Sequence, residues 1–234
     1  MWPTKSKNSF NLKDIKPKVN FQWYKIGFLV FAFTGFSTQA CNQKLNQQKM
    51  NLTVNEEKLD TAVLGGGCFW CLDAVYREME GIVTVNSGYS NGKVKNPTYR
   101  EVCTGNTQCV EVVEIVYDTE KTSYEEILTV FWRIHNPTTL NRQGNDIGTQ
   151  YRSGIYYLND AQKDLALKSK EAVEESKLWE GKIVTEIVPL KDYSVAEDYH
   201  QNYFQNNPNQ PYCTYVVGEK VEKFRKLFAE KRKK

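Results

Sequence analysis

Three consecutive glycines, Gly65 to Gly67, stand directly before a cysteine and a helical pattern of apolar residues. The residues that precede them, 61–64, are apolar and β-prone, which predicts a short strand. The apolar residues that follow recur at the spacing of one buried helix face, and they are Leu72, Val75, Tyr76 and Met79. A strand, a tight glycine turn and a helix must therefore succeed one another here, with Cys68 at the start of the helix.

Strand-like and helix-like patterns alternate along the rest of the chain without a regular repeat. Strands are expected at 82–85, 110–117, 151–158 and 183–188, and turn residues at 87–92 and 96–97 predict a long loop. Thr122 and Ser123, followed three residues later by Glu125 and Glu126, offer a capping box that predicts a helix ending before Pro137. Other helices are expected after Asp160 and over 196–204 and 219–228. This order favours an α+β fold, an α/β two-layer sandwich in which helices flank a mixed β-sheet.

The first 40 residues differ from the rest of the chain. A charge-free apolar run from Ile26 to Phe36 follows Lys25 and precedes small and polar residues, which is the pattern of a secretory signal. The run is shorter than the roughly 20 residues that a spanning helix needs, which disfavours a permanent transmembrane anchor. Ala40 before Cys41 resembles a bacterial lipoprotein cleavage site, so lipidation of Cys41, simple cleavage and an uncleaved anchor remain alternatives.

We therefore expect a signal peptide or lipoprotein signal at 1–40, a flexible tether at 41–60 and a catalytic domain at 61–234. The mature protein would lie in the bacterial cell envelope, either in the periplasm or tethered to a membrane. The formal net charge of +3 comes from lysines in the first 40 residues. Because the remainder is nearly neutral with mixed signs, its charge gives no reason to expect nucleic-acid binding.

Cys68 is the sharpest chemical feature of the sequence. A cysteine at the start of a helix lies where free backbone N–H groups and the helix dipole stabilise negative charge, so its thiolate should form readily. Cys68 and Cys71 also form a C-x-x-C, which by itself supports a thioredoxin-like thiol-disulfide oxidoreductase. A zinc site is a weaker interpretation, because His135 and His200 are the only histidines and no second close cysteine pair follows.

Several separated motifs carry a more specific signal than the cysteine alone. In chain order they are Gly67-Cys68-Phe69-Trp70, Asn96-Pro97-Thr98-Tyr99, Val102-Cys103-Thr104-Gly105, Arg142-Gln143-Gly144-Asn145-Asp146, Gly148-Thr149-Gln150-Tyr151-Arg152-Ser153 and Ala196-Glu197-Asp198-Tyr199-His200-Gln201. Together they resemble the peptide methionine sulfoxide reductase A family, whose members reduce the S epimer of methionine sulfoxide. The resemblance implies the ferredoxin-like core of that family and an enzyme that repairs oxidised methionine, free or in proteins.

The resemblance also implies a role for each matched residue. Cys68 would attack the sulfoxide sulfur and become a sulfenic acid. Phe69 and Trp70 would line an apolar pocket for the substrate methyl group. The groups that act on the sulfoxide oxygen or orient the site would be Glu111, Tyr99, Tyr151 and Asp146. The strand pattern independently places Glu111 on an apolar face, where burial should raise its pKa and keep it a proton donor.

The family resemblance implies that Cys213 resolves the sulfenic acid as a disulfide, from a loop that Pro208 and Pro211 would keep mobile. Thioredoxin or a thioredoxin-like protein would then reduce the disulfide, with no bound cofactor and no metal. Cys71 and Cys109 remain alternative resolving thiols. Cys109 stands where most members have histidine, in Gln108-Cys109-Val110-Glu111 instead of Gly-His-Ala-Glu. Cys103 is assigned to packing, and the protein is expected to be a monomer.

Overall fold

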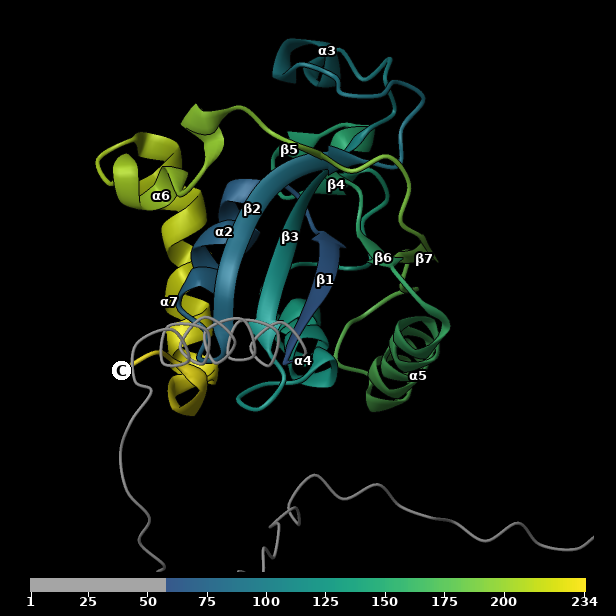
Figure 1. The fold of residues 1–234 in the computed structure, drawn as a ribbon, viewed down its shortest axis with the longest axis vertical. Helices are drawn as coiled ribbons and strands as arrows, with labels where there is room; N and C mark the ends of the chain where they lie inside the picture. The colour runs from purple at the N-terminus through teal and green to yellow at the C-terminus, as the bar shows by residue number, and fades with distance from the viewer. Residues whose placement is uncertain (1–57) are drawn as a thin grey trace, which may run out of the picture. The chain divides into compact units, whose positions relative to one another are not determined.

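The computed structural model describes residues 58–234, and its centre is a six-stranded β-sheet in the order β7-β6-β1-β3-β2-β8 (Figure 1). Neighbouring strands are antiparallel, except for the parallel pair β6 and β7, which makes the sheet mixed. The strands are β1 (Leu59–Gly65), β2 (Ile82–Ser90), β3 (Val110–Asp118), β6 (Gly154–Tyr157), β7 (Glu186–Pro189) and β8 (Ser194–Val195). A separate hairpin consists of β4 (Arg142–Gln143) and β5 (Asp146–Ile147).

The longer helices cover one face of this sheet (Figure 1). They are α2 (Phe69–Arg77), α4 (Tyr124–Ile134), α5 (Asp160–Ser176) and α7 (Gly218–Leu227). The apolar stripe expected on α2 is buried throughout, and the core between helices and sheet is continuous around it. The opposite face is covered by the segment that follows β7, which packs Val188, Leu190 and Tyr193 on a smaller apolar cluster. The expected two-layer α+β fold with a mixed sheet is confirmed.

Two predicted boundaries were wrong because long-range pairing overrides local sequence signals. The expected loop at 87–90 is the second half of β2, where Ser87 to Ser90 pair with Val113 to Val110 of β3. The expected strand at 151–158 is shorter, since Tyr151 belongs to a 3₁₀ turn, η1 (Thr149–Tyr151), and β6 starts at Gly154. Glycine and serine at 87–90 resemble turn residues, but neighbouring strands satisfy their backbone groups on both sides.

The expected helix at 196–204 is divided into η2 (Asp198–His200) and α6 (Tyr203–Asn206). Asn202 lies between them with φ of 52°, a left-handed conformation that interrupts a helix. The strand expected from 183 begins only at Glu186. The helix at 219–228 is confirmed as α7, and the Ser123 cap of α4 is confirmed by the Glu126 N–H that its side chain accepts. His200, in η2, contacts Phe69 and Trp70 at the start of α2.

The folded part begins slightly earlier than expected. Strand β1 starts at Leu59, and Tyr117 donates a hydrogen bond of 2.8 Å to Asp60, so the last residues assigned to the tether belong to the sheet. The signal at 1–40, Cys41 and most of the tether lie outside the described residues. Within residues 58–234, no helix is both long and apolar enough to cross a membrane.

Candidate active site

Cys68 is the N-cap residue of α2, as the glycine turn predicts, and it is almost completely buried. Gly67 before it has φ of 90°, and a Cβ at this position would come within 2.6 Å of the Gln143 side chain. Only glycine therefore combines this backbone conformation with the close approach of Gln143. The turn delivers Cys68 to the end of the sheet where α3 (Tyr99–Cys103), the β4–β5 hairpin and α6 gather (Figure 1).

Glu111 lies beside Cys68, on β3, with an exposed fraction of 1%. Its Oε2 accepts a hydrogen bond of 3.1 Å from the backbone N–H of Phe69, the first residue of α2. Burial raises the pKa of Glu111 to about 8, although the Phe69 N–H and the Cys68 thiol both favour the ionised form. The predicted burial of this carboxyl group is confirmed. At neutral pH most of it is protonated, so it can donate a proton.

Cys68 itself does not have the low pKa that its helix position suggested. Burial raises the pKa of Cys68, and the neighbouring Cys71 thiol and Glu111 carboxyl raise it further. The backbone N–H of Trp70 lowers the pKa of Cys68, as expected at a helix N-terminus, but by less than burial raises it. The expectation of a readily formed thiolate was therefore wrong for this structure. Cys68 is a thiol that contacts a neutral acid.

The two predicted tyrosines lie close enough to Glu111 for its charge to act on both hydroxyl groups. Burial raises the pKa values of Tyr99 and Tyr151, and the charge of an ionised Glu111 would raise both further. Their hydroxyl groups are therefore neutral hydrogen-bond donors. Asp146, on β5, accepts a bond of 2.6 Å from the Tyr212 hydroxyl. The structure thus brings all four predicted groups around Cys68, and adds Tyr212, whose only sequence signal is its place directly before a cysteine.

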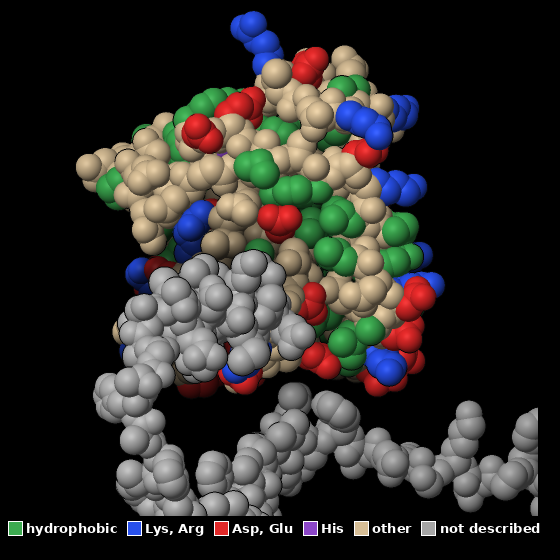
Figure 2. Space-filling model, in the orientation of Figure 1, with side chains coloured by type: hydrophobic (Ala, Val, Ile, Leu, Met, Phe, Trp, Pro, Cys, Tyr) green, Lys and Arg blue, Asp and Glu red, His purple; other side chains and the backbone are tan. Residues whose placement is uncertain are grey.

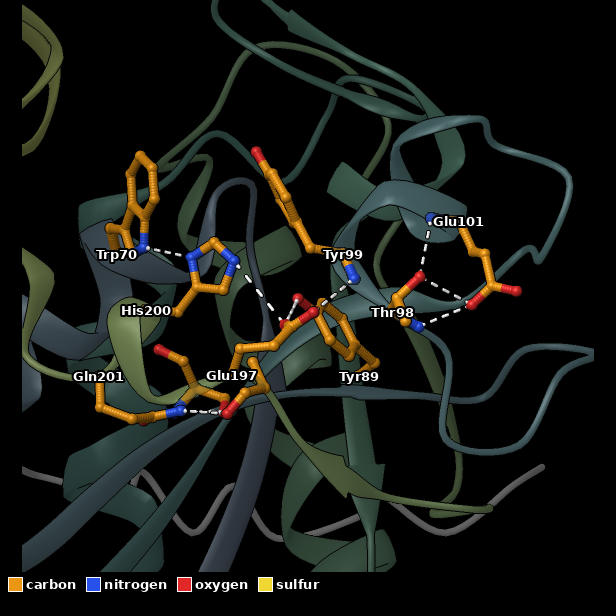
Figure 3. A network of polar contacts seen from close by, with 10 residues as sticks. Trp70, Tyr89, Thr98, Tyr99, Glu101, Glu197, His200 and Gln201 are labelled. Atoms are coloured by element: carbon orange, nitrogen blue, oxygen red, sulfur yellow. Dashed lines mark hydrogen bonds and ion pairs between the residues drawn. The ribbon is translucent and has the colours of Figure 1, made fainter.

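Aromatic side chains form a wall next to the thiol. The Trp70 ring stacks on Tyr203, with ring centroids 3.8 Å apart and planes 7° from parallel. The Trp70 indole N–H donates a bond of 3.2 Å to Nδ1 of His200, whose ring contacts Phe69 at a centroid distance of 5.0 Å (Figure 3). Phe69 is buried and Trp70 is half-buried, so Trp70 leaves part of this apolar wall open to a ligand.

A family model described as "Peptide methionine sulfoxide reductase" matches residues 60–232. The chain belongs to this family. Its catalytic part is 55% identical over 172 residues to the peptide methionine sulfoxide reductase MsrA of Nautilia profundicola, covering 74% of this chain and 98% of that protein. The MsrA of Trichodesmium erythraeum is 50% identical, covering 74% and 97%. The predicted family is confirmed.

Solved structures of the peptide methionine sulfoxide reductase family have the same fold. Mxr1 from Saccharomyces cerevisiae in reduced form aligns with a TM-score of 0.64 and 38% identity, covering 68% of this chain and 91% of that chain. Methionine sulfoxide reductase A of Corynebacterium diphtheriae aligns with a TM-score of 0.60 and 36% identity, covering 68% and 79%. This assignment decides against the thioredoxin-like disulfide oxidoreductase that the C-x-x-C alone would support.

In this member of the peptide methionine sulfoxide reductase family, the remaining thiols differ in their access to Cys68. Cys71 is fully buried one helical turn away, and the Cys68 thiol hydrogen-bonds to it, which is the main reason that the pKa of Cys71 falls to about 7. Cys213 is also fully buried, and burial together with the neighbouring Cys71 raises its pKa. It starts a π-helical turn (Cys213–Val217) that continues into α7, so the expected mobile loop was wrong.

Two other cysteines of this family member have different surroundings. Cys109 donates from its thiol to the carbonyl oxygens of Val94 and Thr107, which holds it against the loop rather than against Cys68. Cys103, assigned to packing from the sequence, is instead exposed at the end of α3, and its thiol hydrogen-bonds with Tyr99. On the face drawn in Figure 2, acidic and basic side chains are interspersed, in agreement with the mixed charge of the sequence.

Proposed function

We propose that the chain reduces the S epimer of methionine sulfoxide, free or within polypeptides, with Cys68 as the nucleophile. The observation that carries the proposal is the contact between the Cys68 thiol and a buried, largely protonated Glu111. Attack on a sulfoxide needs a sulfur nucleophile and a proton for the departing oxygen, and this pair supplies both. Membership of the peptide methionine sulfoxide reductase family supports the same reaction.

The chemical step balances with the groups present. The Cys68 sulfur attacks the sulfoxide sulfur while Glu111 gives its proton to the sulfoxide oxygen, and Tyr99 and Tyr151 donate hydrogen bonds to that oxygen. The S–O bond to methionine then breaks and the hydroxyl group is transferred to Cys68 as a sulfenic acid. The Glu111 carboxylate that this leaves takes up the thiol proton of Cys68, which restores the acid. Methionine is reduced by two electrons and Cys68 is oxidised by two.

The surrounding residues explain why a methionine side chain would fit. Phe69 and Trp70 offer an apolar surface for the methyl group attached to the sulfoxide sulfur. Asp146 accepts a hydrogen bond from the Tyr212 hydroxyl, and the Tyr212 ring packs edge-on against Trp70 at a centroid distance of 5.8 Å. Because the apolar surface suits the methyl group and the hydrogen-bond donors suit the oxygen, only one arrangement of methyl group and oxygen around the sulfur should satisfy both. The site should therefore discriminate between the two sulfoxide epimers.

The experiment is reduction of separated epimers of methionine sulfoxide by the mature protein, with dithiothreitol as the reductant. We expect methionine to be released from the S epimer, with at least about 100-fold slower release from the R epimer, because the wrong epimer leaves buried donors unpaired. Chromatographic quantification of methionine measures both rates. Equal rates with both epimers, or no release from either, would contradict the proposed function.

Recycling of the sulfenic acid requires a second thiol, and we assign this to Cys71 and Cys213 in sequence. The Cys68 sulfenic acid condenses with Cys71, with loss of water, because these two thiols already contact each other. Cys213, packed next to Cys71, then exchanges with that disulfide and leaves Cys68 free as a thiol. The π-helical turn at Cys213 is the local irregularity that would let this sulfur move. Thioredoxin or a thioredoxin-like protein reduces the resulting Cys71–Cys213 disulfide.

The substitution Cys213→Ser should abolish turnover driven by thioredoxin while leaving a single turnover of methionine release intact. The first disulfide can still form in this variant, but it lies on the regular helix α2, without the π-helical turn of Cys213 that would let a disulfide move toward a protein reductant. Rapid-quench measurement of methionine per enzyme gives the single turnover, and thioredoxin-coupled oxidation of NADPH gives the steady state. Cys109→Ser, at a thiol that donates to the carbonyl oxygens of Val94 and Thr107, is the control for the thioredoxin step. If thioredoxin-driven turnover is unchanged in Cys213→Ser, the disulfide that thioredoxin reduces is the one between Cys68 and Cys71.

We also propose that the mature protein is a monomer exported to the cell envelope, with a lipid on Cys41 as its membrane attachment. The support is the apolar run Ile26–Phe36, followed by Ala40 and Cys41. A tether of Asn, Gln and Lys residues up to residue 58 would give the catalytic domain reach from a membrane surface. Mass spectrometry of the mature N-terminus distinguishes a lipidated Cys41 from an unmodified one.

A further inference from the structure

The carboxylate of Glu197 links two elements at the site, helix α3 and strand β2 (Figure 3). Its Oε1 accepts a hydrogen bond of 2.9 Å from the backbone N–H of Tyr99, the first residue of α3. Its Oε2 accepts one of 2.9 Å from the Tyr89 hydroxyl on β2. Burial opposes ionisation of Glu197, but the bonds from Tyr99 and Tyr89 outweigh it and lower the pKa of this carboxyl group. Both bonds are therefore accepted by a charged group, which makes them strong.

His200 stands next to this carboxylate, one turn of η2 further along the chain. Its Nδ1 accepts the hydrogen bond from the Trp70 indole, so in the neutral ring the proton is on Nε2. Nε2 is buried, forms no hydrogen bond within the described residues, and points at Oε2 of Glu197 from 3.9 Å (Figure 3). The edge of the ring also contacts Tyr99, with centroids 4.5 Å apart.

We infer that Glu197 and His200 are positioning residues, which set the separation between the apolar wall at Trp70 and the oxygen donor Tyr99. The inference rests on the proposed function, since it concerns the same substrate site. Trp70 belongs to α2 and Tyr99 to α3, two helices joined only through the long connection that contains β2. The segment that carries Glu197 and His200 contacts both Trp70 and Tyr99, and so it connects α2 to α3 at the site. We call this segment the bridge.

The bridge is itself fixed to the sheet. Gln201, the next residue, accepts a hydrogen bond of 2.9 Å from the N–H of Ser87 and donates one of 3.0 Å to the Ser87 carbonyl. It also donates a bond of 2.9 Å to the carbonyl of Ala196, which closes the turn carrying Glu197 and His200. The Gln201 side chain therefore holds this turn on β2 whether or not a substrate is bound. Such a support can hold the site in its working geometry before substrate binds.

The two residues act on different walls, which gives different kinetic signatures. Loss of the Glu197 carboxylate frees the start of α3 and misplaces the Tyr99 hydroxyl, which acts on the oxygen as it departs. We expect Glu197→Ala to lower kcat about 100-fold with little change in KM, because a displacement on the order of 1 Å has that effect on a catalytic group. Glu197→Gln keeps an oxygen that accepts from Tyr99, so its kcat should fall only about tenfold.

His200 affects the apolar wall instead. His200→Phe keeps an aromatic ring but leaves the Trp70 indole N–H without an acceptor, so the indole turns toward water. We expect KM for the sulfoxide to rise about tenfold with a smaller change in kcat, because substrate and transition state both contact this wall. His200→Asn places an amide oxygen near the position of Nδ1 and should recover part of the lost affinity.

Glu101→Gln is the matched control for Glu197→Gln. Glu101 is on the same helix α3, and its carboxylate accepts exposed hydrogen bonds from Thr98, the N-cap, on the side away from Trp70 and His200 (Figure 3). A glutamine can serve the same capping box, so kcat and KM should stay near those of the wild type. Thermal unfolding and the rate of Cys68 alkylation by iodoacetamide, measured for all variants, show that the fold and the thiol are intact.

The outcomes separate the two levels of the proposal. An active wild type, with kcat reduced in both Glu197 variants, KM raised in His200→Phe and partial recovery in His200→Asn, supports the inference. An active wild type whose Glu197 variants behave like Glu101→Gln would overturn it and leave the proposed function standing. The inference is also overturned, and the proposed function left standing, if the kinetic changes in these variants only follow a fall in their unfolding temperature. A wild type that releases no methionine overturns the proposed function itself.

Discussion

Replacing Cys68 by serine abolishes the reduction of methionine S-sulfoxide, with an expected loss of about 10⁴-fold or more in kcat/KM. Serine has nearly the shape of cysteine, but its hydroxyl group is a much weaker nucleophile toward sulfur and cannot form a sulfenic acid. The neighbouring thiol Cys71 cannot take the place of Cys68 as the nucleophile within residues 58–234. Its hydrogen bond is with Cys68 and not with the Glu111 carboxyl group. Methionine release from the separated S epimer, with dithiothreitol in excess, measures the loss.

Cys109→Ser is the matched control for this experiment. It makes the same atomic change at another buried thiol, one that donates only to the carbonyl oxygens of Val94 and Thr107. A serine hydroxyl can make the same kind of bond, so activity close to the wild type is expected. Residual activity in Cys68→Ser that survives removal of Cys71 and Cys213 would assign the nucleophile to another group, and the proposed mechanism would fail.

The central pair of the site was predictable because each member depends on a local pattern. The glycine turn and the apolar stripe fixed Cys68 at the first turn of a helix, and the structure places it at the N-cap. The alternation of β3 placed Glu111 on its apolar face, and the structure buries it. Strand and helix periodicity depend on neighbouring residues only, so a single sequence carries them in full.

Properties that depend on distant residues were not predictable in this way. The pKa of Cys68 depends on how deeply it is buried, and a helix start in the sequence does not reveal the depth. Cys213 was expected in a loop from its flanking prolines, but packing against α2 keeps it in a helical turn. Glu197 and His200 belong to a recognised motif, yet their partners Tyr99 and Trp70 lie 98 and 130 residues away in the sequence.

Glu111→Gln should lower kcat/KM about 10³-fold, the scale typical of losing a general acid. Glutamine has the same shape and can still accept the hydrogen bond from the Phe69 N–H, so Cys68 stays in place. It has no acidic proton for the sulfoxide oxygen and cannot take the proton of the thiol. Glu114→Gln is the matched control, since Glu114 lies on the same strand β3 and accepts a hydrogen bond from Asn86 instead of facing the site.

The pH dependence of this pair gives the sharper test. Burial raises the pKa of Glu111 to about 8, so the carboxyl group is a proton donor below that pH and a carboxylate above it. The rate of a single turnover by prereduced wild type should therefore be flat below about pH 8 and fall as the pH rises through it. An N-acetylated, amidated methionine sulfoxide avoids titration of the substrate. Glu111→Gln must lack this alkaline decline, because it has no group to titrate there. A decline that persists unchanged in the variant would assign the titration to Cys68 or to a tyrosine, and Glu111 could not be the acid.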